Sequence, residues 1–422
     1  MSTFRQLRNF WIPWVTTIVL ACFSHAVAQK SYRVTDLGVL NGNDNLGCAM
    51  DLNNHGWTLS MNGVLDPVTN FSGAKVLSGH AAINIGELKI DLGTLGGPNS
   101  WMNWGGINDR GEAVGMAETS APDPNGEDFC AFGTKLTCRP FLWREGHMSA
   151  LPTLGGNNGS ASDINNRGQI AGTAETTVAD SGCPASAPMH TILPVIWEEG
   201  KAQPLPTVGG DPDGVAFAIN ARGQVVGESG ICAGALHAIL WERGTAIPLP
   251  DIGGGALAQG MNDRDQIVGT IGSTDGTTEF AALWQNRVLT NLGTLPGDFA
   301  AIATGINNRG QVVGSTLDSG FNWSHGFIWQ DGVMTDLNTL FPAESNLFAT
   351  MANKINEHGQ ISGMATVLSG PHAGDIHAFL ATPVDERVET SIADIAPAHP
   401  KSVLSGQNSR GLFLMFGGPF RQ

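Results

Sequence analysis

The stretch "TGINNRGQVVGST", residues Thr304–Thr316, joins a turn signal to a short run of β-branched residues, and it decides the fold because the chain repeats it. Close copies begin at Gly105, Ser162, Phe217, Gln259 and Asn353, and a more divergent copy begins at Ala49. Self-similarity at such a period is typical of architectures in which each copy is one supersecondary unit.

Each copy contains four short runs separated by turn signals. Around Asn307 the runs are "ATGIN", "QVVGST", "HGFIW" and "VMTDLNTL", with the turns "NRG" and "QDG" and an insert between the second and third runs. Such runs predict four antiparallel strands. The 56 glycines and the many β-branched clusters disfavour helices. A chain of 422 residues also exceeds one ordinary core. We therefore expect an all-β repeat fold.

The Asn-x-Arg-Gly element predicts a hairpin turn with defined roles. Asn307 should bond its own backbone two residues on, and Gly310 should adopt the left-handed conformation. Asp265 replaces this glycine in one copy, where we expect strain. The repeated arginine is interpreted as a solvated turn residue rather than as part of a basic ring for an anionic ligand.

The third run ends in tryptophan in five copies, and histidine recurs at the start of the same run. A large side chain found once per unit is interpreted as the packing block between units, in preference to a sugar-stacking platform. The repeated histidines are interpreted as structural residues rather than metal ligands. The tryptophans are Trp143, Trp197, Trp241, Trp284 and Trp329, and the histidines are His80, His237, His325 and His377.

The two ends of the repeat region complement each other. The last copy stops after its third run, "HAFLATP", whereas "YRVTDLGVL" from Tyr32 is a fourth run without the first three. Pairing these two runs would remove the exposed sheet edges of a linear array. The sequence therefore predicts, over residues 29–384, a seven-bladed β-propeller of four-stranded antiparallel blades closed by the N-terminal strand. A β-solenoid or tandem β-sandwiches are the alternative.

Three recurring pieces occur together: "IN-x-RG-Q-x-x-G", segments such as "HAFLA", and "DLGTLGG". In this combination the chain resembles the HAF repeat family of extracellular bacterial proteins, over roughly residues 32–382. The resemblance implies an exported repeat protein and transfers no activity or catalytic residues. The first and last copies depart from the pattern, because His55 and His358 replace the arginine and the tryptophan is lost.

Residues 1–28 are predicted to be a signal peptide. Arg5 and Arg8 precede the apolar run Phe10–Phe23, and Ala26-Val27-Ala28 fits a signal-peptidase site. A buried core segment or a lipid-modified Cys22 are alternatives. Export places the mature chain outside the cytoplasm, secreted or in the cell envelope. The period ends before residue 385, and residues 385–422 are interpreted as a tail, either a tether or a disordered end.

Composition narrows the partners. Without residues 1–28 the chain keeps 20 basic and 38 acidic residues, a formal charge of −18. Such a surface repels nucleic acid and anionic lipid. No later stretch approaches the roughly 20 apolar residues of a membrane span. We expect no nucleic-acid partner, no membrane span in the mature chain, and a monomer that recognises an extracellular protein or glycan.

Five cysteines follow the signal peptide, and an oxidising compartment favours disulfides. Cys130 and Cys138 are candidates for a local loop, and Cys183 and Cys232 for a link between neighbouring copies. Cys48 would then be the odd thiol. The spacings match no zinc pattern.

The inserts vary in length while the opposite turns do not, so the insert face is the predicted ligand side. Its acidic candidates are Glu118, Glu175 and Glu228. Aromatic candidates outside the repeated register are interpreted as stacking on a sugar or anchoring a partner, with extra packing as the alternative. They are Trp101, Trp104 and Trp323.

No cofactor or metal is expected. The segment "DPNGED" spaces Asp123, Asn125 and Asp128 like a calcium loop, but it lacks the distal bidentate glutamate, so a plain turn is preferred. No Ser/His/Asp or metal signature stands out. The favoured function is an exported, non-catalytic binding or scaffold propeller. The alternative is a propeller hydrolase or lyase acting on extracellular polysaccharide through acidic residues of the insert face.

Overall fold

The computed structural model describes residues 31–65, 76–102, 104–183, 189–232 and 234–384. Throughout these ranges the chain forms β-strands and one short 3-10 helix, and no α-helix is present in them. The all-β prediction is confirmed. The predicted signal peptide, Cys22 within it, and the tail 385–422 lie outside the described residues.

Five of the seven sequence copies form separate four-stranded antiparallel sheets, in which the strands follow chain order. Consecutive pairing of this kind is the predicted meander. The strands are β6 (Gly96–Trp101), β7 (Ala113–Pro122), β8 (Leu136–Arg144) and β9 (His147–Ala150); β10 (Gly155–Ile164), β11 (Ile170–Ala179), β12 (His190–Glu198) and β13 (Lys201–Pro204); β14 (Asp213–Ile219), β15 (Val225–Ile231), β16 (Gly234–Glu242) and β17 (Thr245–Pro248); β18 (Ala256–Met261), β19 (Gln266–Gly272), β20 (Glu279–Gln285) and β21 (Val288–Gly293); and β22 (Ala300–Ile306), β23 (Val312–Leu317), β24 (Trp323–Gln330) and β25 (Val333–Asp336).

The first and last copies share one eight-stranded sheet. Within it, each copy keeps its own antiparallel ladder, and the two ladders meet at a single parallel bridge between Leu46 and Ile376. The 3-10 helix η1 (Leu337–Leu340) precedes the last copy. The strands are β1 (Tyr32–Gly38), β2 (Leu46–Leu52), β3 (Thr58–Leu65), β4 (Val76–Ile85), β5 (Leu88–Asp91), β26 (Leu347–Ile355), β27 (Ile361–Val367) and β28 (Ile376–Pro383).

The N-terminal strand supplies the fourth strand that the last copy lacks. β1 pairs antiparallel with β28, with Val34 opposite Ala381 and Asp36 opposite Phe379. The pairing continues at the ends of both strands, where the Val384 backbone N–H donates to the Ser31 carbonyl at 2.9 Å. The predicted union of the two extremities is confirmed.

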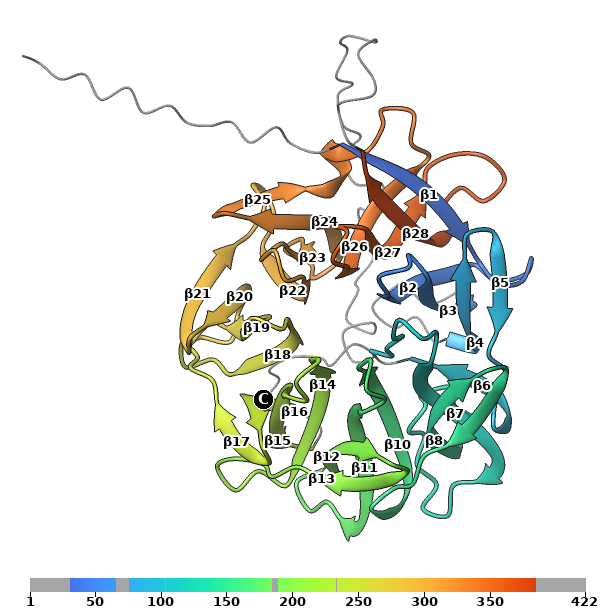
Figure 1. The fold of residues 1–422 in the computed structure, drawn as a ribbon, viewed down its shortest axis with the longest axis vertical. Coiled ribbons are helices and arrows are strands. Elements are labelled where there is room, and N and C mark those ends of the chain that lie inside the picture. Colours follow the sequence, from blue (N-terminus) through green and yellow to red (C-terminus); the bar gives the residue numbers. More distant parts are fainter. Residues whose placement is uncertain (1–30, 66–75, 103, 184–188, 233, 385–422) are drawn as a thin grey trace, which may run out of the picture.

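The sheets stand around a common centre, which makes the molecule a β-propeller (Figure 1). The first strands β14, β18 and β22 lie toward the centre, and the fourth strands β17, β21 and β25 lie at the rim (Figure 1). Neighbouring first strands contact one another from β10 through β14, β18, β22 and β26 to β2, so these contacts cross the chain ends.

The Asn-x-Arg-Gly turn has the predicted conformation. Asn307 Oδ1 accepts backbone N–H bonds from Arg309 at 3.1 Å and Gln311 at 3.2 Å, and Gly310 has φ +76°. Asp265 occupies the same left-handed region at φ +60°. The repeated arginine was predicted to be a solvated turn residue, but it also bonds to the next copy. Arg222 Nη1 donates a hydrogen bond to the Asp263 carbonyl of that copy at 2.6 Å.

The turn asparagine also joins the copies, which sequence patterns did not predict. Among the described residues, seven asparagines, one from each copy, donate their side-chain Nδ2 proton to the backbone carbonyl of the corresponding asparagine in the next copy. These bonds form a closed circle. They run from Asn53 to Asn108 (3.1 Å), Asn108 to Asn165 (3.3 Å), Asn165 to Asn220 (3.0 Å), Asn220 to Asn262 (3.4 Å), Asn262 to Asn307 (2.9 Å), Asn307 to Asn356 (3.0 Å), and Asn356 to Asn53 (3.0 Å).

The repeated tryptophans pack between sheets, as expected. Trp197 belongs to a buried cluster with Val114 of the preceding sheet, and Trp284 to one with Val226. The indole N–H of Trp197 donates to the Pro152 carbonyl at 2.7 Å, so the buried ring keeps its polar atom satisfied. The indole N–H groups of Trp241 and Trp284 make the equivalent bonds to the carbonyls of Pro206 and Pro250.

Candidate functional site on the insert face

One face of the ring carries all the variable connections. Because strands alternate in direction within each sheet, the inserts after second strands and the crossings after fourth strands emerge on the same side. We call this side the insert face. The Asn-x-Arg-Gly turns lie on the opposite side, which we call the turn face.

The structure buries five of the six predicted ligand-binding side chains, and Trp104 is half-buried. They therefore do not stand on an open surface. The exposed fractions are 0% for Glu118, 1% for Glu175, 5% for Glu228, 3% for Trp101 and 6% for Trp323.

The three tryptophans make packing contacts. The Trp101 ring meets Phe132 of the long insert edge-on, with centroids 5.5 Å apart. Trp104 meets Phe217 in the same way at 5.6 Å. Trp323 lies in the same buried cluster as Trp101. These contacts favour the packing alternative over the sugar-stacking interpretation.

Glu118 is held by hydrogen-bond donors inside its own copy. Asn99 donates from Nδ2 to Glu118 Oε2 at 2.7 Å, and the Thr134 hydroxyl donates to Oε1. The other side-chain atom of Asn99, Oδ1, accepts the backbone N–H of Gly79 in the preceding copy at 3.1 Å. A buried carboxylate with both oxygens bonded is a structural brace.

Glu175 occupies the equivalent place on β11 but has different surroundings. The backbone N–H groups of Asn157 and Asn158 donate to its Oε2 at 2.5 and 3.0 Å. The Asn158 amide points at three carboxylates at once: it lies 2.9 Å from Asp123, 3.0 Å from Glu127 and 3.4 Å from Glu175.

This buried acidic group has one histidine partner. His190 Nδ1 lies 2.9 Å from Glu127 Oε1. The hydrogen bond to Glu127 raises the pKa of His190. Burial, followed by the hydrogen bond with Glu127, raises the pKa of Glu175 to about 7. Two adjacent carboxyls in a low-dielectric setting hold one proton between them more readily than two negative charges.

The three calcium candidates do not turn their oxygens toward one common point. Asp123 Oδ1 accepts the backbone N–H of Asn125 at 2.8 Å and of Glu127 at 3.1 Å, which is a side-chain-capped turn. Both Asp128 oxygens accept the backbone N–H of Gly133 instead. Asp123 reaches the acidic group through its second oxygen, and Asn125 Nδ2 lies 3.1 Å from His190 Nδ1, so Asp128 is the candidate that lies apart.

Glu228 stands apart from this group. Together with Glu279 on β20 it is buried with one carboxylate oxygen, Oε2, that has no hydrogen-bond partner among the described residues. Burial raises the pKa of each carboxyl to about 8. Each is therefore a neutral acid at pH 7, which is how a protein accommodates an unpaired buried carboxyl.

The repeated histidines pair with carboxylates through Nδ1, in agreement with a structural role. His237 lies 2.8 Å from Asp211, and His325 lies 2.8 Å from Asp298, whose hydrogen bond raises the pKa of His325. Ser324 also contacts His325, but through the same Nδ1, at 2.9 Å. A hydrolytic triad needs serine and aspartate on opposite ring nitrogens, so this group lacks that geometry. His80 pairs with Asp91 and His377 with Asp36.

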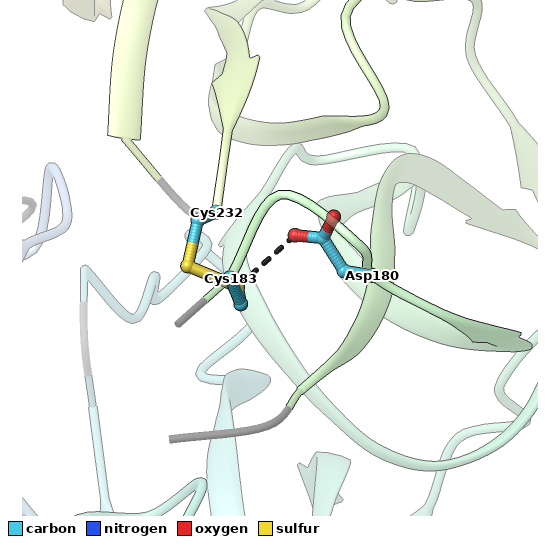
Figure 2. Close-up of side chains that lie close together, drawn as sticks. All are labelled: Asp180, Cys183 and Cys232. Carbon is cyan, nitrogen blue, oxygen red and sulfur yellow. Dashed lines mark hydrogen bonds between the residues drawn. A yellow bond between two sulfur atoms is a disulfide. The ribbon is translucent and has the colours of Figure 1, made fainter. Parts of the chain in front are cut away.

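Two disulfides fix the inserts. Cys130 and Cys138 close a loop in the long insert, with their Cα atoms 5.7 Å apart. Cys183 and Cys232 join the inserts of adjacent copies, with Cα atoms 4.8 Å apart. Figure 2 shows this bond beside Asp180, whose Oδ2 lies 3.0 Å from Cys183 Sγ.

The fifth cysteine, Cys48, lies alone on β2. It is buried as a free thiol, and burial raises its pKa to about 12. It therefore stays protonated and unreactive at neutral pH.

Most of the exposed large apolar side chains among the described residues lie at connections of the insert face. Val178, Ile231 and Leu236 flank the Cys183–Cys232 bond in sequence and are 61%, 52% and 40% exposed. Four further exposed residues lie at inserts or crossings, and three lie at the turns before fourth strands on the turn face. The former are Leu77, Ile252, Phe299 and Leu368; the latter are Leu88, Val288 and Val333.

A charged group on the central strands escaped sequence reasoning. Asp51, Asp163 and Lys354 occupy one repeat position, two residues before the turn asparagine. Lys354 Nζ lies 3.5 Å from Asp51 Oδ1. Burial lowers the pKa of Lys354, but the charges of both aspartates outweigh it and the net direction is upward. The sequence does contain a signal for this group, because the other copies carry glycine or alanine two residues before the turn asparagine.

These aspartates brace neighbouring copies rather than form an open site. Asp51 Oδ2 accepts the backbone N–H of Ile107 at 2.7 Å, and Asp163 Oδ2 accepts that of Ile219 at 2.9 Å. Burial raises the pKa of Asp163. Each carboxylate therefore holds the central strand of the next copy.

No family model matches the chain, and the comparison with curated proteins found no match. Solved structures to which this chain is similar include virginiamycin B lyase from Staphylococcus aureus, with 9% identity over 84% of this chain and 100% of that one, at a TM-score of 0.48. The β-propeller domain of the Trilobed protease from Pyrococcus furiosus has 11% identity over 83% and 93%, at 0.43. YCF48 bound to a D1 peptide has 12% identity over 85% and 97%, at 0.45. Within the described ranges no helix is long and apolar enough to cross a membrane.

Proposed function

We propose that this chain is an exported, non-catalytic binding or scaffold propeller that holds a protein or glycan on its insert face. We further propose seven blades and membership of the HAF repeat family. The closed circle of seven asparagine bonds supports the blade count, as does the single bridge between Leu46 and Ile376 that divides the eight-stranded sheet.

The observation that carries the proposal is that Val178, Ile231 and Leu236 are exposed at the strand ends that border the two disulfide-linked inserts. Exposed apolar patches on soluble proteins mark interaction sites. A disulfide between the two inserts holds them together before binding, which lowers the ordering cost of association. All three side chains are aliphatic, and aliphatic side chains suit a protein partner better than a sugar, which aromatic rings bind by stacking.

Export has physical support in the two disulfides, because such bonds persist in oxidising compartments. A secreted or envelope location therefore agrees with the predicted signal peptide. The charge of the mature chain supports a partner other than nucleic acid.

One observation favours the enzyme alternative, a hydrolase or lyase of extracellular polysaccharide. Glu127 and Glu175 form a carboxyl pair in which the pKa of Glu175 is about 7, a value suited to general acid catalysis. However, Glu175 is only 1% exposed, so a polysaccharide does not reach it without movement of the insert. The binding function is therefore the better supported.

The test immobilises residues 29–422 and exposes them to the secreted and envelope proteins of the source cells and to a glycan array. The triple variant Val178→Ser, Ile231→Ser, Leu236→Ser is compared with the matched turn-face variant Leu88→Ser, Val288→Ser, Val333→Ser. We expect a saturable protein partner that the control retains and the insert-face variant loses by at least about tenfold, since a buried aliphatic side chain contributes about 1.5–3 kcal/mol. Equal binding by both variants, or turnover of a glycan, would contradict the proposal.

A further inference from the structure

The acidic group around Glu175 raises a question of charge balance. Asp123, Glu127 and Glu175 are each at least nine-tenths buried, and all three face the single Asn158 amide. An amide NH2 has two protons, so it cannot satisfy three carboxylates. Among the ion pairs of the described residues, His190 is the only basic partner of the three.

An independent observation comes from the copy that precedes it. Asn99 and Glu118 occupy the same repeat positions as Asn158 and Glu175, and there the second carboxylate oxygen receives the hydroxyl proton of Thr134. The Glu175 carboxyl is instead hydrogen-bonded to a second carboxyl, that of Glu127, which comes from the insert of the preceding copy. Glu127 in turn contacts the imidazole of His190. The hydroxyl donor of Thr134 thus has no counterpart beside Glu175, where a carboxyl and an imidazole, both able to bind a metal ion, are found instead.

The donor atoms converge from three separate segments. Glu127 comes from the insert after β7, Glu175 from β11 and His190 from β12, and their ligand atoms all lie within 4.8 Å of one another. A zinc-type ion binds carboxylate oxygen and imidazole nitrogen at about 2.0–2.2 Å, whereas calcium takes oxygen ligands alone. The mixed set therefore favours the transition metal.

We propose that Glu127, Glu175 and His190 bind a divalent transition-metal ion of the zinc type, with Asp123 positioned beside it. The ion would neutralise the buried carboxylates and fasten the insert of one copy to the strands of the next. This inference is independent of the proposed binding function, because it concerns charge balance beneath the insert and not the apolar residues at its surface.

The test strips residues 29–422 with a chelator, dialyses them, and titrates them separately with Zn²⁺ and Ca²⁺ by calorimetry. We expect one bound Zn²⁺ per chain, a rise in Tm, and at least about tenfold weaker binding of Ca²⁺. Glu127→Gln and His190→Gln should each weaken Zn²⁺ binding by more than the roughly 10–100-fold that loss of an outer-shell partner costs. His237→Gln, which removes an equivalent histidine–carboxylate pair, should leave it within about twofold.

Zn²⁺ binding that persists undiminished in Glu127→Gln and His190→Gln would place the ion elsewhere, for example at His372, Asp375 and His377, and would overturn the proposal. The absence of any zinc binding would do so as well. If the variants fail to fold, the wild-type chain still decides the matter through Co²⁺. Visible bands typical of mixed nitrogen and oxygen ligation that persist in His372→Gln support the site, and bands that are absent or lost in that variant contradict it.

Discussion

The side-chain amide of Asn356 donates a hydrogen bond to the backbone carbonyl of Asn53, 3.0 Å away, although 303 residues separate them. This bond closes the circle in which the side chain of each turn asparagine donates a hydrogen bond to the backbone carbonyl of the next. The same side chain accepts N–H bonds from His358 and Gln360, both at 3.0 Å. One residue type thus forms the turn and joins it to its neighbour.

Replacement of Asn356 by alanine should therefore destabilise the fold by about 2–4 kcal/mol, because buried backbone groups in two copies lose their partners. Urea unfolding of the purified chain measures this change. Asn165→Ala is the matched control, since Asn165 makes the same set of bonds within the ring. A much smaller effect at Asn356 would mean that the seam between the chain ends is open.

Asp265 offers a test of backbone strain. It holds φ +60° where other copies have glycine, so Asp265→Gly should stabilise the chain by up to about 1 kcal/mol. Its exposed ion pair with Arg222 offsets little of this gain. The reverse change, Gly310→Asp, should cost about 1 kcal/mol, because Gly310 has φ +76° and a Cβ there would meet only the Gln266 side chain, in ordinary contact at 3.7 Å. Thermal unfolding should move in opposite directions for the two variants.

The buried acid Glu228 predicts a pH dependence. Its folded pKa is raised to about 8 from 4.5, so the folded state holds a proton that the unfolded state releases between those values. Stability is therefore greatest below about pH 4.5 as far as this group is concerned, and falls as pH rises to about 8. At one pKa unit per roughly 1.4 kcal/mol, the cost at pH 7 is about 3 kcal/mol.

Glu228→Gln should raise the unfolding free energy at pH 7 by most of that cost. It should also flatten the dependence of this free energy on pH between about pH 5 and 8, the interval between the unfolded and folded pKa values. Glu87→Gln is the control, because Glu87 is exposed and its carboxyl is solvated in both states. An unchanged slope in Glu228→Gln would show that the carboxyl is ionised in the folded protein.

The two disulfides should differ in their contribution. Cys183 and Cys232 are 49 residues apart and join two copies, whereas Cys130 and Cys138 are 8 apart within one insert. The loop-closure relation gives about 4 kcal/mol for the first and about 2.5 kcal/mol for the second. Denaturant unfolding of the two double serine variants measures both. A larger loss from the short loop would contradict this entropic account.

The fold was predictable because its signals are local and repeated. Asn307 and Gly310 specify the same turn in the sequence as in the structure, and the missing fourth run specified the pairing of β1 with β28. The asparagine circle was not predictable in this way. Its donor and acceptor lie a whole copy apart, so no local pattern distinguishes a side chain that bonds its neighbour from one in solvent.

The site was less accessible to sequence reasoning. The sequence indicated Glu118 and Glu175 as acidic candidates, but their burial depends on how the long insert folds over them, and insert sequences carry no period. Glu127 and His190 lie 63 residues apart and meet only through that folding. Lys354 and its two aspartates did break the repeat, and a column-by-column comparison of the copies would have revealed them.

The seam between β1 and β28 has a mechanical consequence. The chain enters at Ser31 and leaves at Val384, and these residues are hydrogen-bonded side by side at the rim. Tension applied to the two ends would load the bonds of this one strand pair in succession, as in the opening of a zipper, instead of all at once. The propeller should therefore yield first by peeling off β1, while the other sheets still hold the loops of the insert face in place.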